Sequence, residues 1–191
     1  MSRSKRQFPD ERAGSFPEPP LSFTDREGRE IEIRPYAGEV ENGDGEASGD
    51  GEAAEREEFE AVVEMYADFD PADRAQGIPP ATESRVRDWF EGLLEGLNVV
   101  AWHDDRAVGH ATLVPDEETY ELAIFVHQDY QRAGIGSKLI RALLGYGRAE
   151  GVEKVWLSVE RWNHAAVNLY EAVGFETYGA ESFELEMGLR L

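Results

Sequence analysis

The sequence predicts a single α/β (α+β) domain in which strands and helices alternate along most of the chain. Three observations support this prediction. Hydrophobic residues make up 41% of the 191 residues, enough for one packed core. Helical spacing of apolar residues gives way several times to the alternation or short apolar runs typical of strands. No internal repeat is visible, which argues against a solenoid or propeller.

The first quarter of the chain is the least regular part. Residues 1–22 are rich in proline, serine and charge and are expected to form a disordered tail, so that the domain comprises residues 23–191. Residues 30–36 alternate polar and apolar side chains, as a half-buried strand does. Residues 37–53 are acidic and glycine-rich and are expected to form a solvated loop.

The remaining sequence reads as alternating helices and strands. Helices with an apolar face are expected at residues 55–69 and 82–94, joined by a turn-rich connection at 70–80 of the kind that often contacts ligands. The later elements are expected in this order: strands at 98–102, 107–114 and 120–127, a helix from 135 to a stop at Gly151, a strand at 154–159, a helix at 165–173, and a closing hairpin at 175–178 and 182–189.

The charge balance restricts the partners. The formal net charge is −21, and the chain has three lysines, at positions 5, 138 and 154. Such a surface repels nucleic acids and anionic membranes, so neither is expected as a partner. In molar salt the Debye length falls to about 3 Å, which would screen the self-repulsion. The charge therefore favours a halophilic source, and the alternative is an ordinary acidic protein with an acidic linker.

Several classes of site and location are disfavoured by what the sequence lacks. The absence of cysteine excludes disulfides, thiolate metal sites and a cysteine nucleophile. The four histidines are scattered without ligand spacing, so no metal is expected. No apolar run reaches the roughly 18–20 residues of a membrane span, and the N-terminal residues lack the apolar core of a signal peptide. We therefore expect a cytoplasmic protein.

The segment Gln131–Gly136 (QRAGIG) lies between a buried strand and an amphipathic helix and is the most informative part of the chain. Its glycines let the backbone approach a ligand closely, and the helix that follows presents its positive N-terminal end. Together these features suit a pyrophosphate. The ionised side chains of this helix region are all basic: Arg132, Lys138, Arg141 and Arg148. The alternative is that Gly134 and Gly136 only serve a tight turn between strand and helix.

A second segment, NHAAVNLYEAVGF at residues 163–175, follows after one helix and one strand. The two segments in this order resemble the GNAT superfamily of N-acetyltransferases. The resemblance covers about residues 98–191 and extends to the strand at 30–36. It implies a mixed, mostly antiparallel sheet of six to seven strands flanked by about four helices. It also implies acetyl-CoA as co-substrate and a homodimer as one form of assembly. The stretch YELAIFVHQDYQRAGIG is, in addition, similar to bacterial and archaeal protein-lysine acetyltransferase domains.

The resemblance also implies roles for individual residues. In the superfamily the glycine loop binds the CoA pyrophosphate, and the preceding strand pairs with the pantetheine amides. The loop corresponds here to Gln131, Arg132, Ala133, Gly134, Ile135, Gly136 and Ser137, and the strand end corresponds to Ile124, Phe125 and Val126. Asn163 matches a position that hydrogen-bonds pantetheine, and Asn168 lies near the same arm.

Tyr170 and Glu121 are the candidate catalytic residues. Tyr170 matches the tyrosine that protonates the leaving thiolate, and the alternative is a buried aromatic on a short helix. Glu121 begins the strand that leads to the CoA site and is the candidate general base, and the alternative is an exposed acid at a strand end. His110 and His127 are weaker candidates for proton relay.

The expected function is an N-acetyltransferase that moves an acetyl group from acetyl-CoA to a primary amine by direct attack. A protein lysine or N-terminus is one expected acceptor. A small-molecule amine, such as an amino acid or polyamine, is the alternative. A CoA-binding module without turnover is a third reading, disfavoured by the presence of both Tyr170 and Glu121.

Overall fold

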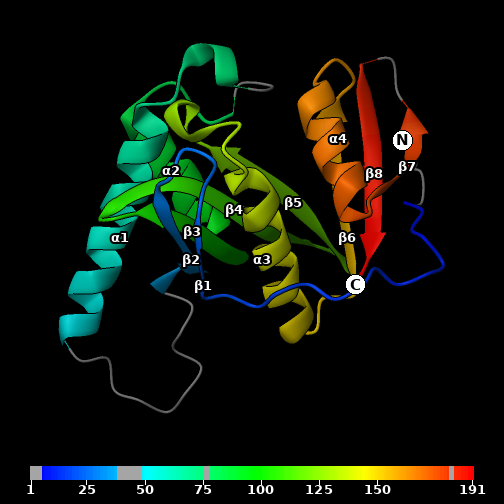
Figure 1. Ribbon diagram of the computed structural model, residues 1–191, viewed down its shortest axis with the longest axis horizontal. Coiled ribbons are helices and arrows are strands. Elements are labelled where there is room, and N and C mark those ends of the chain that lie inside the picture. Colours follow the sequence, from blue (N-terminus) through cyan, green and yellow to red (C-terminus); the bar gives the residue numbers. More distant parts are fainter. Residues whose placement is uncertain (1–5, 38–48, 75–77, 181–182) are drawn as a thin grey trace.

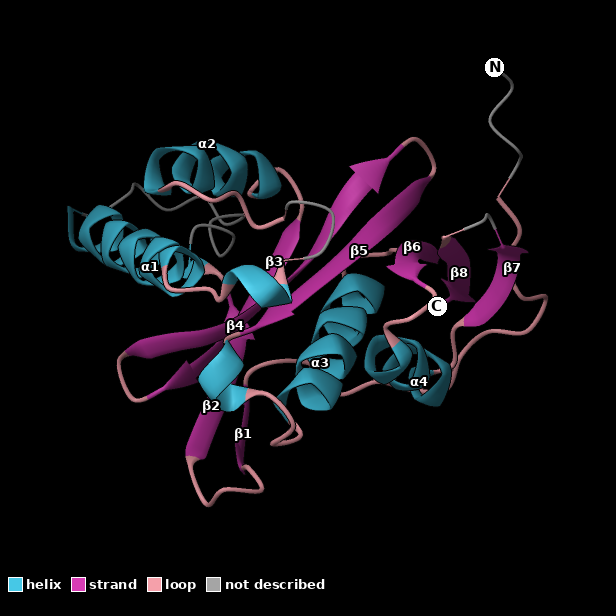
Figure 2. Cartoon of the chain, turned by 90° about the horizontal axis from the view of Figure 1, so that it is seen from above, coloured by secondary structure: helices cyan, strands magenta, loops and turns pink. Residues whose placement is uncertain are grey.

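The structure is a computed structural model that describes residues 6–37, 49–74, 78–180 and 183–191. Within these residues one eight-stranded sheet runs in the order β1-β2-β3-β4-β5-β6-β8-β7. Helices α1 and α2 cover one face of the sheet, and α3 and α4 cover the other (Figures 1 and 2). Neighbouring strands are antiparallel except β5 and β6, which are parallel. The mixed, mostly antiparallel fold expected from the sequence is confirmed.

The strands are β1 Leu21–Thr24, β2 Glu30–Pro35, β3 Leu97–His103, β4 Arg106–Asp116, β5 Thr119–Val126, β6 Lys154–Glu160, β7 Glu176–Ala180 and β8 Glu184–Arg190. The helices are α1 Gly49–Ala67, α2 Glu83–Leu93, α3 Ile135–Ala149 and α4 His164–Val173, with short 3-10 turns at Pro71–Asp73 and Gln128–Tyr130. From β3 onward each element lies where the apolar pattern predicts it. The eighth strand is β1, which the sequence analysis did not predict.

The N-terminal segment is ordered from residue 6, whereas a disordered tail was expected over residues 1–22; residues 1–5 lie outside the described part. The Ala13 N–H donates to the Arg190 carbonyl oxygen at 2.7 Å. The Pro17 carbonyl oxygen passes over Gly145, only 2.1 Å from where a Cβ would be. Proline and serine disfavour helix and strand in this segment, but the segment still packs against the rest of the domain. Leu21–Thr24 then pairs with β2.

The acidic loop is shorter at its C-terminal end than the expected 37–53, because α1 begins at Gly49. The first turns of α1 contain the stretch EAAERE, whose residues have high helix propensity but show no apolar stripe. Spacing of apolar residues therefore could not reveal this part of the helix. Residues 38–48 of the expected loop lie outside the described residues.

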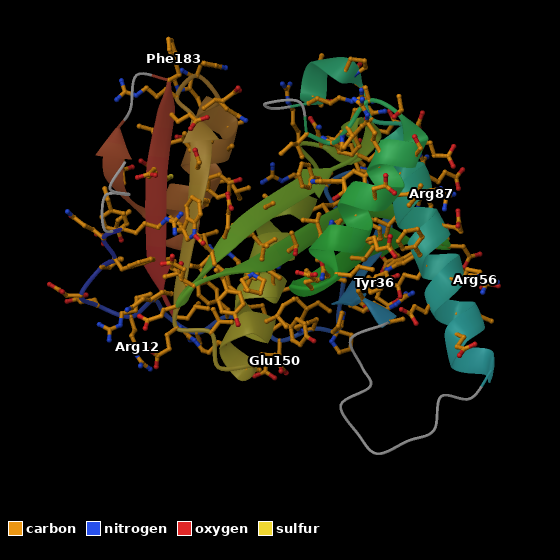
Figure 3. The ribbon with its side chains drawn as sticks, turned by 180° about the vertical axis from the view of Figure 1, so that it is seen from behind. Arg12, Tyr36, Arg56, Arg87, Glu150 and Phe183 are labelled. Atoms are coloured by element: carbon orange, nitrogen blue, oxygen red, sulfur yellow. The ribbon has the colours of Figure 1, made fainter. Side chains whose placement is uncertain are left out.

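Each face of the sheet has its own apolar core. On one face Leu139, Ile140, Leu143 and Leu144 of α3 are fully buried. On the other, Tyr36 at the end of β2 is 1% exposed, and its ring packs 5.7 Å from Phe90 of α2 (Figure 3). Burying a side chain of this size stabilises the fold by roughly 1.5–3 kcal/mol. Both helix layers are thereby fixed on the sheet, which positions the site described next.

Candidate active site

Strands β5 and β6 touch at one end and then diverge. They share two register pairs, Tyr120↔Val155 and Glu121↔Trp156, close to the start of each strand. Beyond these pairs β5 stays with β4 as far as Val126, and β6 stays with β8. We call this arrangement the β5–β6 splay; Figure 1 shows the two strands meeting near the C-terminus and separating from there. The edge of β5 that faces away from β4 is therefore left without a strand partner, as an extended amide-bearing ligand requires.

The splay contains the strand residues expected to contact pantetheine. Ile124, Phe125 and Val126 are all partly buried and lie at the end of β5. Phe125 faces the α1/α2 layer, where its ring packs 5.4 Å from Tyr66 and 5.5 Å from Trp89. Ile124 and Val126 pack against the core on the α3 side. The structure thus places these residues beside the unpaired edge, between the two helix layers.

The glycine loop connects the end of β5 to the start of α3. Gly134 precedes the helix in the left-handed conformation at φ 90°, and Arg132 also has a positive φ of 61°. The first N–H bonded to the helix backbone is that of Lys138, which donates to the Gly134 carbonyl oxygen. The preceding N–H groups of the first turn, at residues 135–137, have no intrahelical acceptor. They sit at the positive end of the helix dipole and suit a phosphate.

The glycine at position 136 is not required by the packing of the protein itself. A Cβ on Gly136 would meet Leu169 at 3.7 Å and Val126 at 3.8 Å, which are ordinary contacts. By contrast, Gly147 would place a Cβ 2.6 Å from the Leu113 side chain. A close approach by a ligand backbone or phosphate is a physical reason for a glycine that internal packing does not demand. The loop therefore fits a CoA pyrophosphate.

The basic side chains around the loop differ from the set expected. Arg141 donates to the Ala172 carbonyl oxygen at 2.9 Å and joins α3 to α4. Arg148 lies in the last turn of α3, roughly 20 Å from the loop along the axis, and donates to the Ala13 carbonyl oxygen. Arg132 and Lys138 remain exposed near the loop. Two of the four basic residues therefore serve structural contacts.

The sequence analysis missed a contribution from the turn between β1 and β2. The Arg26 N–H donates to the Ala133 carbonyl oxygen at 3.1 Å, and its guanidinium reaches the Arg132 carbonyl oxygen at 3.5 Å. Arg29 of the same turn donates to the Asp129 carbonyl oxygen at 3.0 Å. These contacts span about a hundred residues of sequence, so no local signal could have revealed them. They add a positive charge beside the loop.

Tyr170 lies on α4, one residue after the Leu169 side chain that faces the loop. The ring is 9% exposed and packs 5.9 Å from the Phe175 ring. Burial raises the pKa of its hydroxyl to about 12, so the phenol stays protonated at neutral pH. The burial agrees with the alternative of a core aromatic, and the protonated hydroxyl agrees with the role of proton donor.

The other candidate residues occupy less distinctive positions. Glu121 lies where β5 and β6 meet and is partly buried; by strand alternation it shares the sheet face of Phe125. The Asn163 side chain caps α4 by accepting from the Ala166 N–H at 3.1 Å. Asn168 is exposed on α4, and Gln131 donates from its side chain to the Val126 carbonyl oxygen at 3.1 Å.

Neither histidine candidate is exposed to solvent. His110 is fully buried between Tyr66 and Asn98, and burial lowers its pKa to about 3, so it stays neutral. His127 is also fully buried, with Nε2 3.0 Å from an Asp68 oxygen and Nδ1 accepting from the Asp129 N–H. His110 lies in the α1/α2 core and is held in a fixed network, which is unsuited to a proton relay.

The described part of the chain was also compared with what metal binding and membrane insertion require. It contains no group of three or more His, Cys, Asp or Glu side chains that could hold a metal ion. None of its helices combines the length and apolar character needed to cross a membrane. Two hollows, of about 670 and 340 Å³, lie against α1 and against the N-terminal segment, away from the splay.

Solved structures with the same fold are numerous. The GNAT domain of S. lividans PAT superposes with a TM-score of 0.66 at 13% identity, covering 90% of this chain and 96% of that one. YncA from Salmonella typhimurium, solved with its cofactor acetyl-CoA, gives a TM-score of 0.59 at 20% identity over 84% of this chain and 94% of that one. At these identities the likeness shows the fold alone.

Sequence comparison identifies N-acyltransferases that are similar to part of this chain. The [ribosomal protein bS18]-alanine N-acetyltransferase of Salmonella typhimurium is 39% identical over 80 residues, which cover 41% of this chain and 54% of that one. The L-amino acid N-acyltransferase MnaT of Escherichia coli is 26% identical over 46% of this chain and 63% of that one. The chain therefore spans little more than half the length of these two curated relatives. The model of the acetyltransferase (GNAT) family matches residues 59–175, and the chain belongs to this family.

Proposed function

We propose that this chain transfers an acetyl group from acetyl-CoA to a primary amine by direct attack of the amine on the thioester. One observation carries the proposal: the glycine loop and the start of α3 follow the end of β5, on the open side of the β5–β6 splay and beside the unpaired edge of β5. Acetyl-CoA supplies the activated acetyl group. Its pyrophosphate would rest on the N–H groups of residues 132–137, with Gln131 opening the loop, and its pantetheine arm would follow Ile124, Phe125 and Val126.

The chain's own residues would move the two protons. The buried hydroxyl of Tyr170 donates to the sulfur as the thiol leaves, because its high pKa keeps it protonated. Glu121 accepts the proton of the attacking amine from the opposite face of the sheet, directly or through water. Asn163 and Asn168 would contact the pantetheine arm from α4, although the Asn163 oxygen also caps that helix.

A polypeptide amine, at a lysine or an N-terminus, is the acceptor that we propose first. Two of the exposed large apolar side chains, Trp162 at 58% and Phe183 at 67% exposed, contact each other where β6 ends and β8 begins. Figure 3 shows Phe183 at this end of the molecule. Both side chains lie at the end where the strands diverge, and such a pair suits a polypeptide better than a polyamine. A small-molecule amine is the second candidate, because relatives include an L-amino acid N-acyltransferase.

Four broader expectations remain proposals. The charge of −21 supports a halophilic source, since screening by molar salt would relieve the self-repulsion. We also propose a cytoplasmic location. Because the family resemblance implies a homodimer as one form of assembly, we propose this assembly as well. We propose no nucleic-acid or membrane partner, on the same electrostatic grounds.

A thiol-release assay with acetyl-CoA and a panel of amines tests the proposed function. The panel should contain lysine peptides, peptides with a free N-terminus, single amino acids and polyamines, each at low and at molar salt. We expect release of CoA with at least one amine and a preference for peptides. Tight binding of CoA without turnover on any amine would instead identify a binding module.

Gly136→Ala tests the phosphate loop separately from the chemistry. The new methyl group meets only ordinary contacts, so the free energy of unfolding should stay the same or rise by up to about 1 kcal/mol. The Kd for CoA, measured by calorimetry, should rise about tenfold or more, since the methyl group stands where the phosphate approaches. Gly92→Ala in α2, where a Cβ meets nothing within 4 Å, is the matched control. Equal CoA affinity in both variants would place the phosphate elsewhere.

Glu121→Gln tests the proposed base. The amide keeps the size of the side chain but cannot accept a proton, so kcat at neutral pH should fall by about 10²-fold or more while the Kd for CoA changes little. The rate should recover partly at high pH, where more of the amine is already deprotonated. Glu186→Gln, at an exposed position of β8, is the control and should retain the parent rate. A Glu121→Gln variant with the parent kcat and pH profile would remove Glu121 from the mechanism.

A further inference from the structure

The angle between the two halves of the sheet depends on few contacts between strands. Strands β1–β5 form one half, and β6, β8 and β7 form the other. Among the described residues, the two register pairs at the start of β5 and β6 are the only ones that join these halves within the sheet. The site proposed above lies between the halves, so whatever fixes their angle also fixes the shape of the CoA site.

The N-terminal segment crosses the point where the halves meet. Figure 1 shows it running along the lower end of the molecule, from beside β7 past α3 to β1. The guanidinium of Arg6 forms an ion pair with Asp116, the last residue of β4. The same guanidinium lies 3.5 Å from the ring centroid of Trp156 in β6. One side chain therefore binds both halves of the sheet at once.

The contact with Trp156 lies next to the proposed base. Trp156 is the register partner of Glu121, and register partners on neighbouring strands share a face roughly 4.8 Å apart. The indole Nε1 is buried and has no hydrogen-bond partner among the residues that the structure describes. Stacking against Arg6 therefore helps to fix the orientation of the indole ring. The ring in turn lies beside the Glu121 position.

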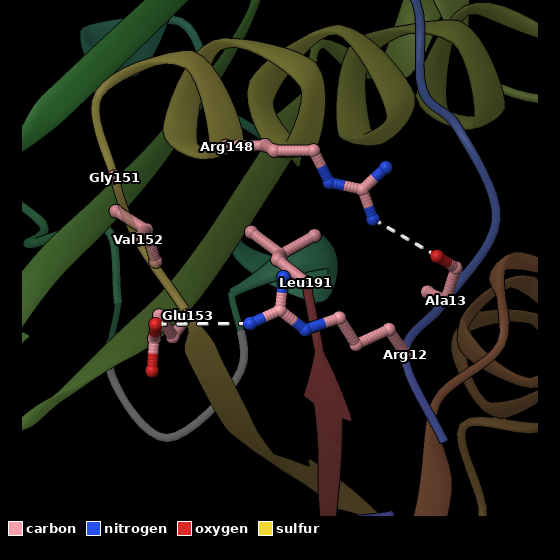
Figure 4. A pocket seen from close by; sticks show the side chains of 7 residues that line it. All are labelled: Arg12, Ala13, Arg148, Gly151, Val152, Glu153 and Leu191. Atoms are coloured by element: carbon pink, nitrogen blue, oxygen red, sulfur yellow. Dashed lines mark hydrogen bonds and ion pairs between the residues drawn. The ribbon is translucent and has the colours of Figure 1, made fainter.

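The segment that carries Arg6 is itself anchored. The Phe8 ring packs 6.2 Å from Tyr178 of β7, and the Ala13 N–H binds the Arg190 carbonyl oxygen of β8. Arg148 of α3 donates to the Ala13 carbonyl oxygen at 2.9 Å (Figure 4). Because these contacts already order the segment, little further conformational entropy is lost when Arg6 binds across the two halves.

We propose that Arg6 is a positioning residue that holds the two halves of the sheet at the angle that the CoA site requires. This inference rests on the function proposed above. Arg6 touches neither the thioester nor the amine; it acts through Asp116 and Trp156. Its loss lets the halves move relative to each other, which weakens CoA binding and displaces Glu121 from the reacting amine.

Substitution of Arg6 with a matched control gives the first test. Arg12 belongs to the same segment and pairs with Glu153 at 3.8 Å, but it is 63% exposed and binds one half only (Figure 4). Arg6→Ala should raise the Kd for CoA about tenfold and lower kcat, whereas Arg12→Ala should change neither by more than about twofold. Arg6→Lys should recover part of the affinity, since lysine keeps the charge but not the planar stack.

A distance measurement gives a second test that needs no activity. The chain has no cysteine, so a pair of spin labels can be placed at the exposed positions Asp105 and Arg161, one on each half. Arg6→Ala should shift or broaden the distance distribution, and Arg12→Ala should leave it unchanged. Unchanged distances in Arg6→Ala would overturn the proposal, as would changed distances with the parent Kd for CoA. A wild-type chain that binds no CoA would refute the proposed function, while the distances would still decide whether Arg6 sets the angle.

Discussion

Replacing Tyr170 with phenylalanine is expected to lower kcat by about 10²-fold or more while leaving the Kd for CoA within about twofold of the parent value. The ring would keep its place in the core beside Phe175, so only the hydroxyl is lost. Without that proton donor the sulfur must leave as a thiolate, which raises the barrier. The measurement is kcat from thiol release between pH 6 and 9, with CoA affinity from calorimetry.

The raised pKa makes the expectation for Tyr170 more specific. Because burial moves the pKa from 10 to about 12, the hydroxyl stays protonated through the alkaline range in which most enzymes are assayed. Its ionisation should therefore cause no loss of rate below about pH 11. Tyr178→Phe on β7 is the matched control, since that hydroxyl bonds only the Gly188 carbonyl oxygen in the same hairpin. Parent kcat in Tyr170→Phe would show that the ring merely fills the core.

The second large effect concerns stability and centres on a buried chain of hydrogen bonds. The amide nitrogen of Asn98 donates to the carbonyl oxygens of Leu93 and Gly96, at 3.1 and 2.9 Å. Its oxygen is therefore the acceptor for His110 Nε2 at 2.9 Å. His110 Nδ1 must then accept from the Tyr66 hydroxyl at 2.6 Å. This chain requires a neutral imidazole with the proton on Nε2.

Acid should therefore destabilise the fold through His110. The pKa is about 3 in the folded state against 6.5 in the unfolded state, so the unfolded state binds more protons between these values. The free energy of unfolding should fall as pH drops from 6.5 towards 3, by a total on the order of 5 kcal/mol. Urea unfolding at a series of pH values in molar salt measures this slope.

His110→Gln isolates the titration from the hydrogen bonds. Glutamine can donate to Asn98 and accept from Tyr66 but does not ionise, so its slope between pH 4 and 6.5 should be shallower than that of the parent. His164→Gln on the exposed start of α4 should keep the parent slope. Identical slopes in both variants would show that buried carboxylates, and not His110, dominate acid unfolding.

The fold from β3 onward was predictable because its signals are local. The change of period at Ile135 marks α3, and the glycine at 174, with φ 115°, ends α4 as expected. The family resemblance implied that the end of β5 would pair with pantetheine, but nothing in β5 and β6 themselves shows where their pairing stops. The site residues of the loop followed from glycine positions and helix polarity.

The remainder depended on contacts between distant parts of the chain. The order of residues 6–22 rests on bonds such as that from Ala13 to Arg190, which no composition reveals. Closeness in the sequence was also a poor guide to which basic residues lie near the loop. Arg148 lies at the far end of α3, whereas Arg26, from the turn between β1 and β2, contacts the loop. Charge near a site in the sequence is thus a poor guide to charge near it in space.

The turn between β1 and β2 also affects the conformation that the glycine loop has before acetyl-CoA would bind. Arg26 contacts the carbonyl oxygens of Arg132 and Ala133 in the glycine loop, and Arg29 contacts that of Asp129 just before the loop. A loop that is held in one conformation before a ligand binds is preorganised, so binding energy need not be used to order it. The residues matched by the family model, 59–175, do not include this turn. A chain trimmed to those residues would keep every loop residue and lose the contacts that hold the loop ready.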